Sequence, residues 1–310
     1  MGTIISLINL KGGVGKTTCC VNIAGEFANS HKKVLVIDMD TQANASVLLM
    51  NPVNYNRKIL LENENNNSEN NIISKTIYQV FRDEIYDEKK FSFDNTIIKS
   101  VIKINGNKRM AQEPLPNLDL IPTTYHLQTL EQNIVNYDRT KYIILNKVLK
   151  KIKDKYDLIF IDCPPNIYTA TKNALYASDF YIIPTLPDYL SMSGIHLLIN
   201  QLNKIIEIKE EETEKSVKLL GILLNNVDGR TNVHKEGIKN IGHRLDLFKQ
   251  EKMVNENAVI FNTRISKTVK INEASGEFLP ICLNSPRDKA TGEFKSLCTE
   301  ILDQISVNKE

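Results

Sequence analysis

The residues best suited to chemistry lie close together near the start of the chain, in a stretch that reads Lys11-Gly12-Gly13-Val14-Gly15-Lys16-Thr17-Thr18. Glycines let successive backbone N–H groups turn inward, and the start of a following helix adds unpaired amides and a positive dipole end. Such a loop holds a phosphate group. We expect Lys16 to reach the β- and γ-phosphates of a nucleotide and the Thr17 hydroxyl to bind Mg²⁺.

This loop departs from the usual pattern G-x-x-x-x-G-K-[ST] in one respect. Leu10 occupies the position of the first glycine, so that a second lysine, Lys11, lies inside the loop. Glycine-rich turns before helices also occur without a ligand. Here an apolar strand, the glycines, Lys-Thr and a helix follow in the order that phosphate binding needs, which favours a nucleotide site.

Carboxylates follow two other apolar runs. Residues 34–37 lead into Asp38 and Asp40, and residues 158–161 lead into Asp162. Open parallel sheets bind ligands at the carboxyl ends of their strands, so we expect these acids near the phosphate loop. An acid in the position of Asp162 can hold Mg²⁺ or its water ligands. Apolar runs that end in Asp are common, and only the pairing with the loop makes this assignment persuasive.

The elements that must position these groups alternate along the chain. Short apolar runs predict strands, and apolar spacing of 3.6 residues predicts helices. Strands are expected at 4–10, 34–37, 118–122, 157–162, 180–184 and 219–224, and helices at 19–28, 76–82, 142–153, 193–208, 233–245 and 292–305, with a helix start at 125–132 and a solvated helix end at 209–215. The alternation predicts an α/β fold with a doubly wound, mainly parallel sheet flanked by helices. Residues 92–112 fit either a helix end or strands, with a turn at 105–107.

Composition is that of a globular protein, with 42% hydrophobic and 25% charged residues and a net charge of +2. We expect one domain over residues 1–310, with a mobile asparagine-rich loop at about 61–71. No apolar run approaches the roughly 20 residues of a membrane span, and a signal peptide is not evident, so a cytoplasmic location is expected. Residues 1–6 fit a myristoylation pattern, but lipidation would pull the first strand away from the loop. The scattered cysteines predict reduced, buried thiols; they are Cys19, Cys20, Cys163, Cys282 and Cys298.

Three motifs resemble those of the ParA/Soj partition ATPases, which belong with MinD to the deviant Walker A ATPases. They are KGGVGKTT at 11–18, VLVIDMDTQAN at 34–44 and DLIFIDCPPN at 157–166. Weaker likenesses continue to the stretch that begins at Phe261, so the resemblance covers nearly the whole chain. Thr41 and Ala43 stand where the family usually has proline and glycine. The chain begins at its first strand, without the DNA-reading extension of larger plasmid ParA proteins, which makes operator binding less expected.

The resemblance implies a P-loop NTPase fold, ATP and Mg²⁺ as cofactors, and a sandwich homodimer in the ATP-bound state. Lys16 would hold the phosphates of its own nucleotide, whereas Lys11 would reach the nucleotide of the other subunit. Asp40 would position the attacking water, and Asp162 would hold the water shell of the metal beside Thr17. Asp38 is open between a structural and a metal role. The nucleotide would be bound by Gly12, Gly13, Val14, Gly15, Lys16, Thr17, Thr18 and, at adenine, Asn225.

The family also implies slow, partner-stimulated ATP hydrolysis, non-specific DNA binding, a ParB-like centromere-binding partner and association with the nucleoid. Basic residues near the C-terminus are candidates for DNA contacts. The first three recur at helical spacing, and acidic residues interrupt the set, so a merely solvated face is the other reading; the residues are Arg264, Lys267, Lys270, Arg287, Lys289 and Lys295. A MinD-like membrane-associated ATPase is the main alternative, although the last helix is neither basic nor broadly apolar. Cys163 has no companion nearby, which disfavours an iron–sulfur carrier.

Overall fold

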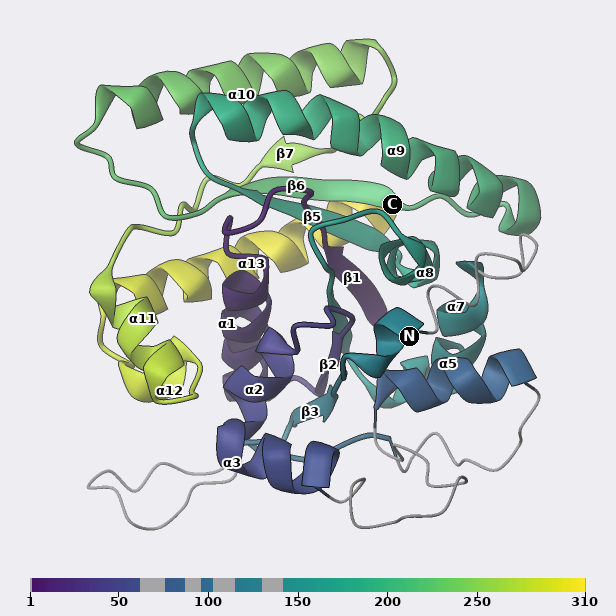
Figure 1. Cartoon of the computed structure of the whole chain (residues 1–310). Coiled ribbons are helices and arrows are strands. Elements are labelled where there is room, and N and C mark those ends of the chain that lie inside the picture. Colours follow the sequence, from purple (N-terminus) through teal and green to yellow (C-terminus); the bar gives the residue numbers. More distant parts are fainter. Residues whose placement is uncertain (1, 62–75, 87–95, 103–114, 130–141, 310) are drawn as a thin grey trace.

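A computed structural model describes residues 2–61, 76–86, 96–102, 115–129 and 142–309. Within these residues, seven strands form one sheet in the order β3-β2-β4-β1-β5-β6-β7, and every neighbouring pair is parallel (Figure 1). The strands are β1 (Thr3–Leu7), β2 (Val34–Asp38), β3 (Leu118–Ile121), β4 (Leu158–Asp162), β5 (Phe180–Thr185), β6 (Lys218–Leu224) and β7 (Val259–Ile260).

Helices cover both faces of the sheet (Figure 1). One apolar core joins the sheet to α1 (Lys16–Asn29), α2 (Asn44–Met50), α3 (Pro52–Tyr55), the π-helical segment η1 (Asn56–Leu61), α11 (Val269–Gly276), α12 (Ile281–Asn284) and α13 (Lys289–Lys309). The other core joins it to α5 (Ile77–Tyr86), α7 (Ile144–Leu149), α8 (Thr169–Ala177), α9 (Tyr189–Thr213) and α10 (Asn232–Gln250). The predicted doubly wound α/β fold is therefore confirmed.

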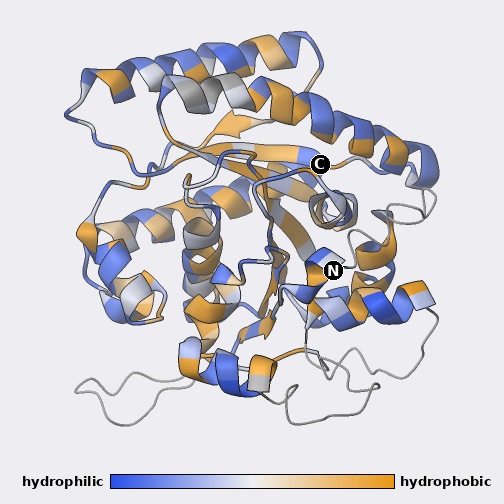
Figure 2. Ribbon diagram, in the orientation of Figure 1, coloured by the Kyte–Doolittle hydropathy of each residue, from blue (hydrophilic) through white to orange (hydrophobic). Residues whose placement is uncertain are grey.

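The strands are continuous apolar runs because both of their faces are covered. All five residues of β1, β2 and β4 are buried, and Figure 2 shows hydrophobic residues along the strands between the helical layers. β1 lies between β4 and β5, and Leu7 at its end pairs with Asp162. The loop that follows β1 is therefore at the carboxyl edge of the sheet, which is where open α/β sheets bind ligands.

The predicted helix over 142–153 is shorter in the structure. α7 ends at Leu149, and residues 153–155 form a separate 3₁₀ turn, η4 (Lys153–Lys155). The chain must turn here to enter β4, since the Asp157 N–H donates to the Lys33 carbonyl at 2.8 Å beside the start of β2. The segment 209–215 is the predicted solvated helix end, since α9 ends at Thr213 and residues 210–212, 214 and 215 are exposed; Lys209 differs, because it is only 7% exposed.

The ambiguous segment 92–112 is described only over residues 96–102. Ile98 forms an antiparallel bridge with Leu120, and Val101 donates to the Leu118 carbonyl, so these residues lie along the β3 edge of the sheet. The turn at 105–107, most of the asparagine-rich stretch at 61–71 and the end of the helix expected at 125–132 lie outside the described residues. In the part of the chain that is described, the helices are too short or too polar to cross a membrane.

Candidate nucleotide-binding site

The loop between β1 and α1 is shaped by two glycines in left-handed conformation. Gly13 has φ 74° and Gly15 has φ 87°, values that other residues adopt only with strain. Gly15 precedes the first residue of α1, and no side chain caps this helix start. The first-turn N–H groups are therefore available to an anion, as phosphate binding requires.

Lys16 is buried against the loop that it completes. It is 7% exposed, and its Nζ donates to the Lys11 carbonyl at 3.2 Å. Burial lowers the pKa of Lys16, while the nearby carboxylates of Asp162 and Asp40 raise it. The ammonium is thus held among acids at the floor of the loop, where a phosphate would add the further negative charge that compensates for burial.

Asn225 connects this loop to the end of β6. Its Nδ2 donates to the Val14 carbonyl at 2.8 Å, and a Cβ on Gly15 would lie 2.2 Å from the same nitrogen. The sequence predicted Asn225 as an adenine contact, and that role stays a prediction. What the structure adds is that its amide fixes the shape of the phosphate loop. The two residues joined are 211 positions apart in the chain, so sequence patterns gave no sign of this contact.

Asp162 stands at the end of β4 with an unusual environment. It is fully buried, and neither carboxylate oxygen has a hydrogen-bond partner among the described residues. Burial raises the pKa of this carboxyl well above its usual value, and the charge of Asp38 adds to the effect, whereas the neighbouring Thr17 hydroxyl and Lys16 oppose it. Unsatisfied buried acceptors beside a phosphate loop fit the water shell of Mg²⁺.

The metal would be held with few direct protein ligands. In the described ranges, no cluster of three or more His, Cys, Asp or Glu side chains is arranged to hold an ion by itself. Mg²⁺ usually keeps several waters and takes one or two protein oxygens together with substrate phosphates. Thr17, in the first turn of α1, and Asp162, through water, fit that arrangement.

Asp38 is paired in register with Asp162 at the end of β2. Its Oδ1 accepts a hydrogen bond from the Asp40 N–H at 3.1 Å, and its Oδ2 accepts from the N–H and the hydroxyl of Ser46 at 2.8 and 2.7 Å. Burial raises the pKa of Asp38 to about 7, and these hydrogen bonds limit the rise. The contacts give Asp38 a structural role, anchoring α2 to the sheet, and its metal role stays a prediction.

Asp40, two residues beyond β2, is 8% exposed and lies near the loop. Its Oδ1 accepts a hydrogen bond from the Gln42 N–H at 3.0 Å. Its negative charge raises the pKa of both Lys16 and Asp162. A carboxylate held in this position can orient a water molecule or accept a proton from it.

The Lys11 side chain points away from the loop, toward the start of α9. Its Nζ lies 3.2 Å from both carboxylate oxygens of Asp188 and 3.0 Å from the Ser191 hydroxyl. Asp188 caps α9 by accepting the Ser191 N–H at 2.7 Å. Partial burial would raise the pKa of Asp188, but these donors hold it below its usual value. Sequence reasoning missed Asp188; its only signal was an Asp-x-x-Ser capping pattern after a strand.

The basic residues near the C-terminus come from several elements, and Lys289 donates to the Ser266 hydroxyl at 3.2 Å, beside the segment that carries Arg264 and Lys267. Arg264 and Lys267 belong to an extended segment, so the helical spacing predicted for them is wrong; α11 begins only at Val269. The extended backbone is fixed by pairing, because Ile265 donates to Leu224 and Lys267 donates to Val227.

Two of these basic residues form ion pairs with acids on their own helices. Lys270 pairs with Glu273 at 2.8 Å and Lys289 with Glu293 at 3.2 Å. All six side chains are exposed: Arg264, Lys267, Lys270, Arg287, Lys289 and Lys295.

A parallel sheet whose central strand leads into a glycine-lysine loop at a helix start defines a P-loop nucleotide-binding protein. A family model described as an AAA domain matches residues 2–218. The sporulation initiation inhibitor protein Soj of Bacillus subtilis is 29% identical over 97% of this chain and 98% of its own length. The chromosome-partitioning ATPase Soj of Treponema pallidum is 26% identical over 97% and 98%. The chain therefore belongs to the ParA/Soj family of ATPases.

Solved structures agree on the fold. A plasmid partition protein from Borrelia burgdorferi superposes with a TM-score of 0.62 at 21% identity, covering 98% of this chain and 99% of that one. Cobyrinic acid a,c-diamide synthase from Mycobacterium smegmatis, solved with ADP and magnesium, superposes with a TM-score of 0.68 at 18% identity, covering 99% and 96%. The same sheet and helices thus occur in proteins of different activity.

Proposed function

We propose that this chain is an ATP-dependent DNA partition ATPase. ATP with Mg²⁺ binds the loop and brings two copies together as a sandwich dimer. The dimer binds DNA without reading its sequence, and a ParB-like partner stimulates slow hydrolysis and release. The chain would act in the cytoplasm, in association with the nucleoid.

The observation that carries this proposal is the contrast between the two lysines of the loop. Lys16 is 7% exposed and turned into the loop, whereas the Lys11 side chain is 35% exposed and turned away toward α9. One charge suffices to bind the phosphates within a subunit. A second charge outside the loop is suited to the γ-phosphate of another subunit, which would make association depend on ATP.

Exposed aromatic side chains at the same edge of the sheet support an association face there. Tyr168, between β4 and α8, is 67% exposed, and Tyr189, at the start of α9, is 75% exposed. Aromatic residues are enriched in protein interfaces because they bury large areas at a low entropic cost. Both tyrosines follow strands that flank β1, so a partner facing the loop would cover them.

The hydrolytic step assigns roles to four polar side chains. Asp40 would orient the attacking water, and Lys16 would stabilise charge on the transferred phosphoryl group. Thr17 and Asp162 would hold the magnesium ion, which neutralises phosphate charge when bound. Burial of Asp40 limits the water that reaches it, in keeping with a slow reaction that waits for a partner.

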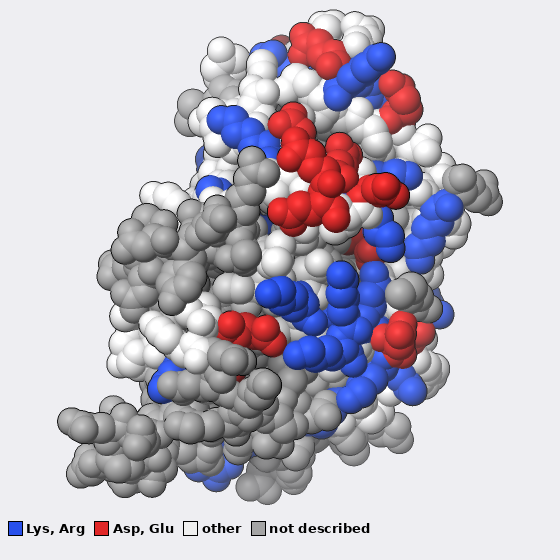
Figure 3. Space-filling view, turned by 90° about the vertical axis from the view of Figure 1, so that its right-hand side faces the viewer, with Lys and Arg blue, Asp and Glu red and all other residues white. Residues whose placement is uncertain are grey.

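ATP-dependent DNA binding favours contacts close to the loop. Arg264 and Lys267 are held beside the carboxyl end of β6, at the same edge as the phosphates. A second group of exposed lysines lies on and after α7; it comprises Lys147, Lys150, Lys151 and Lys155. Figure 3 shows lysine and arginine side chains gathered below a patch of acidic ones on one face of the molecule. The lysines on and after α7 precede β4 and so lie toward the opposite edge of the sheet. We therefore assign the ATP-dependent contacts to Arg264 and Lys267.

The alternative function, a MinD-like membrane regulator, requires an apolar helix face that is free to enter the bilayer interface. In α13, Ile301 is fully buried and Ile305 is 6% exposed, both in the core shared with α1. Leu302 and Val307, at 39% and 47%, are the large apolar side chains of this helix that are exposed. The packing of α13 thus favours DNA over a membrane.

The test is a paired binding experiment. Binding to DNA of unrelated sequences and to anionic liposomes is measured with ATP and with ADP. We expect DNA binding that is tighter with ATP and weakens with salt, because phosphate contacts release counterions. ATP-dependent pelleting with liposomes, without DNA binding, would overturn the proposal in favour of the membrane function.

A further inference from the structure

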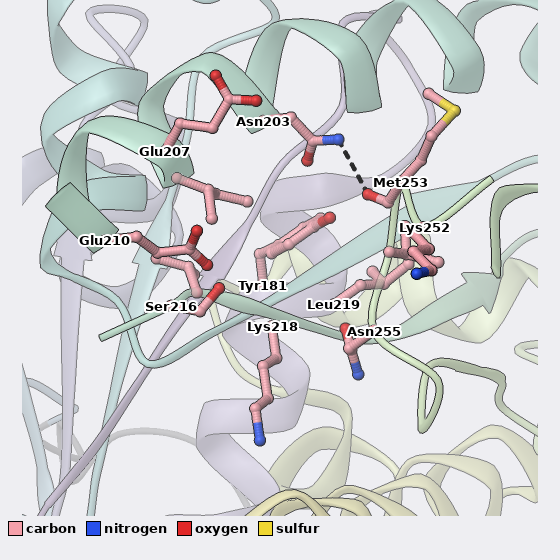
Figure 4. A pocket seen from close by; sticks show the side chains of 13 residues that line it. Tyr181, Asn203, Glu207, Glu210, Ser216, Lys218, Leu219, Lys252, Met253 and Asn255 are labelled. Atoms are coloured by element: carbon pink, nitrogen blue, oxygen red, sulfur yellow. Dashed lines mark hydrogen bonds between the residues drawn. The ribbon is translucent and has the colours of Figure 1, made fainter. Parts of the chain in front are cut away.

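A pocket of about 310 Å³ lies at the amino-terminal ends of β5 and β6, opposite the phosphate loop (Figure 4). Its walls come from the second half of α9, from the starts of the two strands and from residues 252–255, which follow α10. The volume lies at the lower end of the range for small-molecule sites, about 300 to 1,000 Å³. It suffices for one ammonium or guanidinium group with its methylene stem.

Tyr181 of β5 lines this pocket with a hydroxyl that has no hydrogen-bond partner among the described residues. The residue is 1% exposed, and burial raises its pKa, so the phenol stays neutral. Figure 4 shows its oxygen directed into the pocket, between α9 and the segment that carries Met253. Buried tyrosine hydroxyls usually find a partner, so one that faces a cavity is suited to a ligand.

Asn255 supplies a second polar atom without a partner. Its Nδ2 donates to the Asn308 Oδ1 at 3.0 Å, and Asn308 in turn donates to the Gln304 carbonyl at 2.9 Å. This chain of donors fixes the orientation of the Asn255 amide. The Asn255 Oδ1 is therefore a buried acceptor that lacks a donor among the described residues.

Two carboxylates stand above these groups. Glu207 and Glu210 project from one side of α9, three residues apart, and both line the pocket (Figure 4). On the same helix, Asn203 donates to the Met253 carbonyl at 2.9 Å and closes the upper wall.

The lysines of the lining are less suited to a ligand. Lys218 donates to the Asn308 carbonyl at 2.7 Å, and Figure 4 shows its ammonium turned away from the pocket. Lys252 is exposed, as Glu207 and Glu210 are, but it lies on the turn that ends α10, and Figure 4 shows its ammonium on the side of Tyr181 away from the two glutamates. The ligand-directed groups are therefore acceptors, apart from the hydroxyl, which can both accept and donate.

We propose that this pocket binds a cation with several N–H donors, either an alkylammonium or a guanidinium group. Its N–H groups would donate to Glu207, Glu210 and the Asn255 oxygen, with the Tyr181 oxygen as a further acceptor. Such a group is carried by a free polyamine and by a lysine or arginine side chain of another protein. The site is separate from the nucleotide site and does not depend on the function proposed above.

The experiment is calorimetric titration of the full chain with spermidine, with N-acetyl-arginine amide and, for comparison, with inorganic phosphate. We expect saturable binding of at least one of the two cations and none of phosphate. Tighter binding of spermidine would identify the ligand as a free polyamine. Tighter binding of N-acetyl-arginine amide would identify it as a side chain of another protein. Tyr181→Phe keeps the ring and removes only the hydroxyl, and it is expected to weaken binding about threefold. Glu207→Gln with Glu210→Gln is expected to weaken it by about tenfold or more.

Glu236→Gln is the matched control, because Glu236 is an exposed glutamate on α10 outside the pocket. It should bind the cation as the wild type does. Equal losses in Glu236→Gln and in the pocket variants would mean attraction by surface charge alone and would overturn the site. Absence of saturable binding to both cations, or tighter binding of phosphate, would overturn it as well.

Discussion

Lys11 and Asp188 form an ion pair across 177 residues of sequence, with the ammonium 3.2 Å from both carboxylate oxygens. The pair joins the phosphate loop to the first turn of α9. In the proposed dimer, Lys11 must leave Asp188 to reach the nucleotide of the other subunit. In that dimer the ion pair would compete with dimerisation, and its strength would set part of the ATP dependence of association.

The first prediction concerns this competition. Asp188→Asn keeps a residue type that caps helices and removes the charge that holds Lys11. Because the two side chains are 35% and 29% exposed, the pair contributes at most about 1 kcal/mol, and ATP-dependent dimerisation should tighten by up to about fivefold. Sedimentation equilibrium with a non-hydrolysable ATP analogue measures this change. Lys11→Ala should abolish dimerisation. A weaker dimer in Asp188→Asn would contradict the proposal that Asp188 and the nucleotide of the other subunit compete for Lys11.

The second prediction separates binding from hydrolysis. Asp40→Ala should still bind ATP and dimerise, but its turnover should fall by a factor of about 10² to 10⁴, the usual contribution of a positioned general base. Nucleotide binding by equilibrium dialysis and phosphate release distinguish the two steps. Lys16→Ala serves as the opposite control, since it should lose ATP binding itself. Normal hydrolysis in Asp40→Ala would remove its catalytic role.

The third prediction tests the contact between Asn225 and the phosphate loop. Gly15→Ala should abolish nucleotide binding, because its Cβ would lie 2.2 Å from the Asn225 Nδ2 and because φ is 87°. Asn225→Ala removes the hydrogen bond to Val14 and should weaken ATP binding about threefold to tenfold. In the double variant the clash is gone and the backbone strain remains, so partial recovery relative to Gly15→Ala is expected. If the double variant recovers no nucleotide binding, the backbone strain at residue 15 accounts for the whole loss in Gly15→Ala.

Most of the sheet could be predicted from the sequence because a parallel strand covered on both faces is a continuous apolar run. The runs at 34–37 and 158–161 became β2 and β4, and the carboxylates that follow them lie side by side. Local spacing was less informative where the chain is held by distant backbone pairing. Residues 264–267 have helical spacing of charge but lie extended, because their N–H and C=O groups pair with β6 and the residues after it.

The candidate site was predictable where its residues are consecutive and unpredictable where contacts link distant segments. The glycines and Lys16 define the loop by themselves. The contacts of Lys11 with Asp188 and of Asn225 with Val14 depend on how α9 and β6 meet the loop, which only the fold determines. Burial of a side chain is likewise determined only by the fold. Nothing in the sequence around Asp162 shows that both of its carboxylate oxygens lack a hydrogen-bond partner.

The fourth prediction is a pH dependence of stability. Burial, with repulsion from Lys153, Lys215 and Lys150, lowers the pKa of Lys209 to about 8, although Asp179 opposes the shift. An unfolded lysine titrates near 10.4, so between these two values the unfolded chain binds more protons and stability rises with pH.

Against a Lys209→Met variant, the wild-type free energy of unfolding should therefore rise by an amount on the order of 3 kcal/mol between pH 7.5 and pH 10.5. Urea denaturation at a series of pH values measures the difference. Because both proteins share all other titrating groups, a flat difference would show that Lys209 titrates normally.

The last prediction compares two pairs of cations that carry equal charge. Arg264→Gln with Lys267→Gln removes two charges beside the carboxyl end of β6, and Lys147→Gln with Lys150→Gln removes two from α7 and the turn after it. If DNA phosphates contact the first pair in both subunits of the ATP dimer, its loss removes four contacts and should reduce the slope of log affinity against log salt by about 3.6 and remove much of the advantage of ATP over ADP. The second pair should leave that advantage unchanged, because its lysines lie toward the edge of the sheet that the nucleotide does not reach. Fluorescence anisotropy with labelled duplexes of unrelated sequence, over a series of salt concentrations, measures both slopes. A loss of ATP dependence in the α7 pair alone would move the DNA contact to α7 and the turn after it.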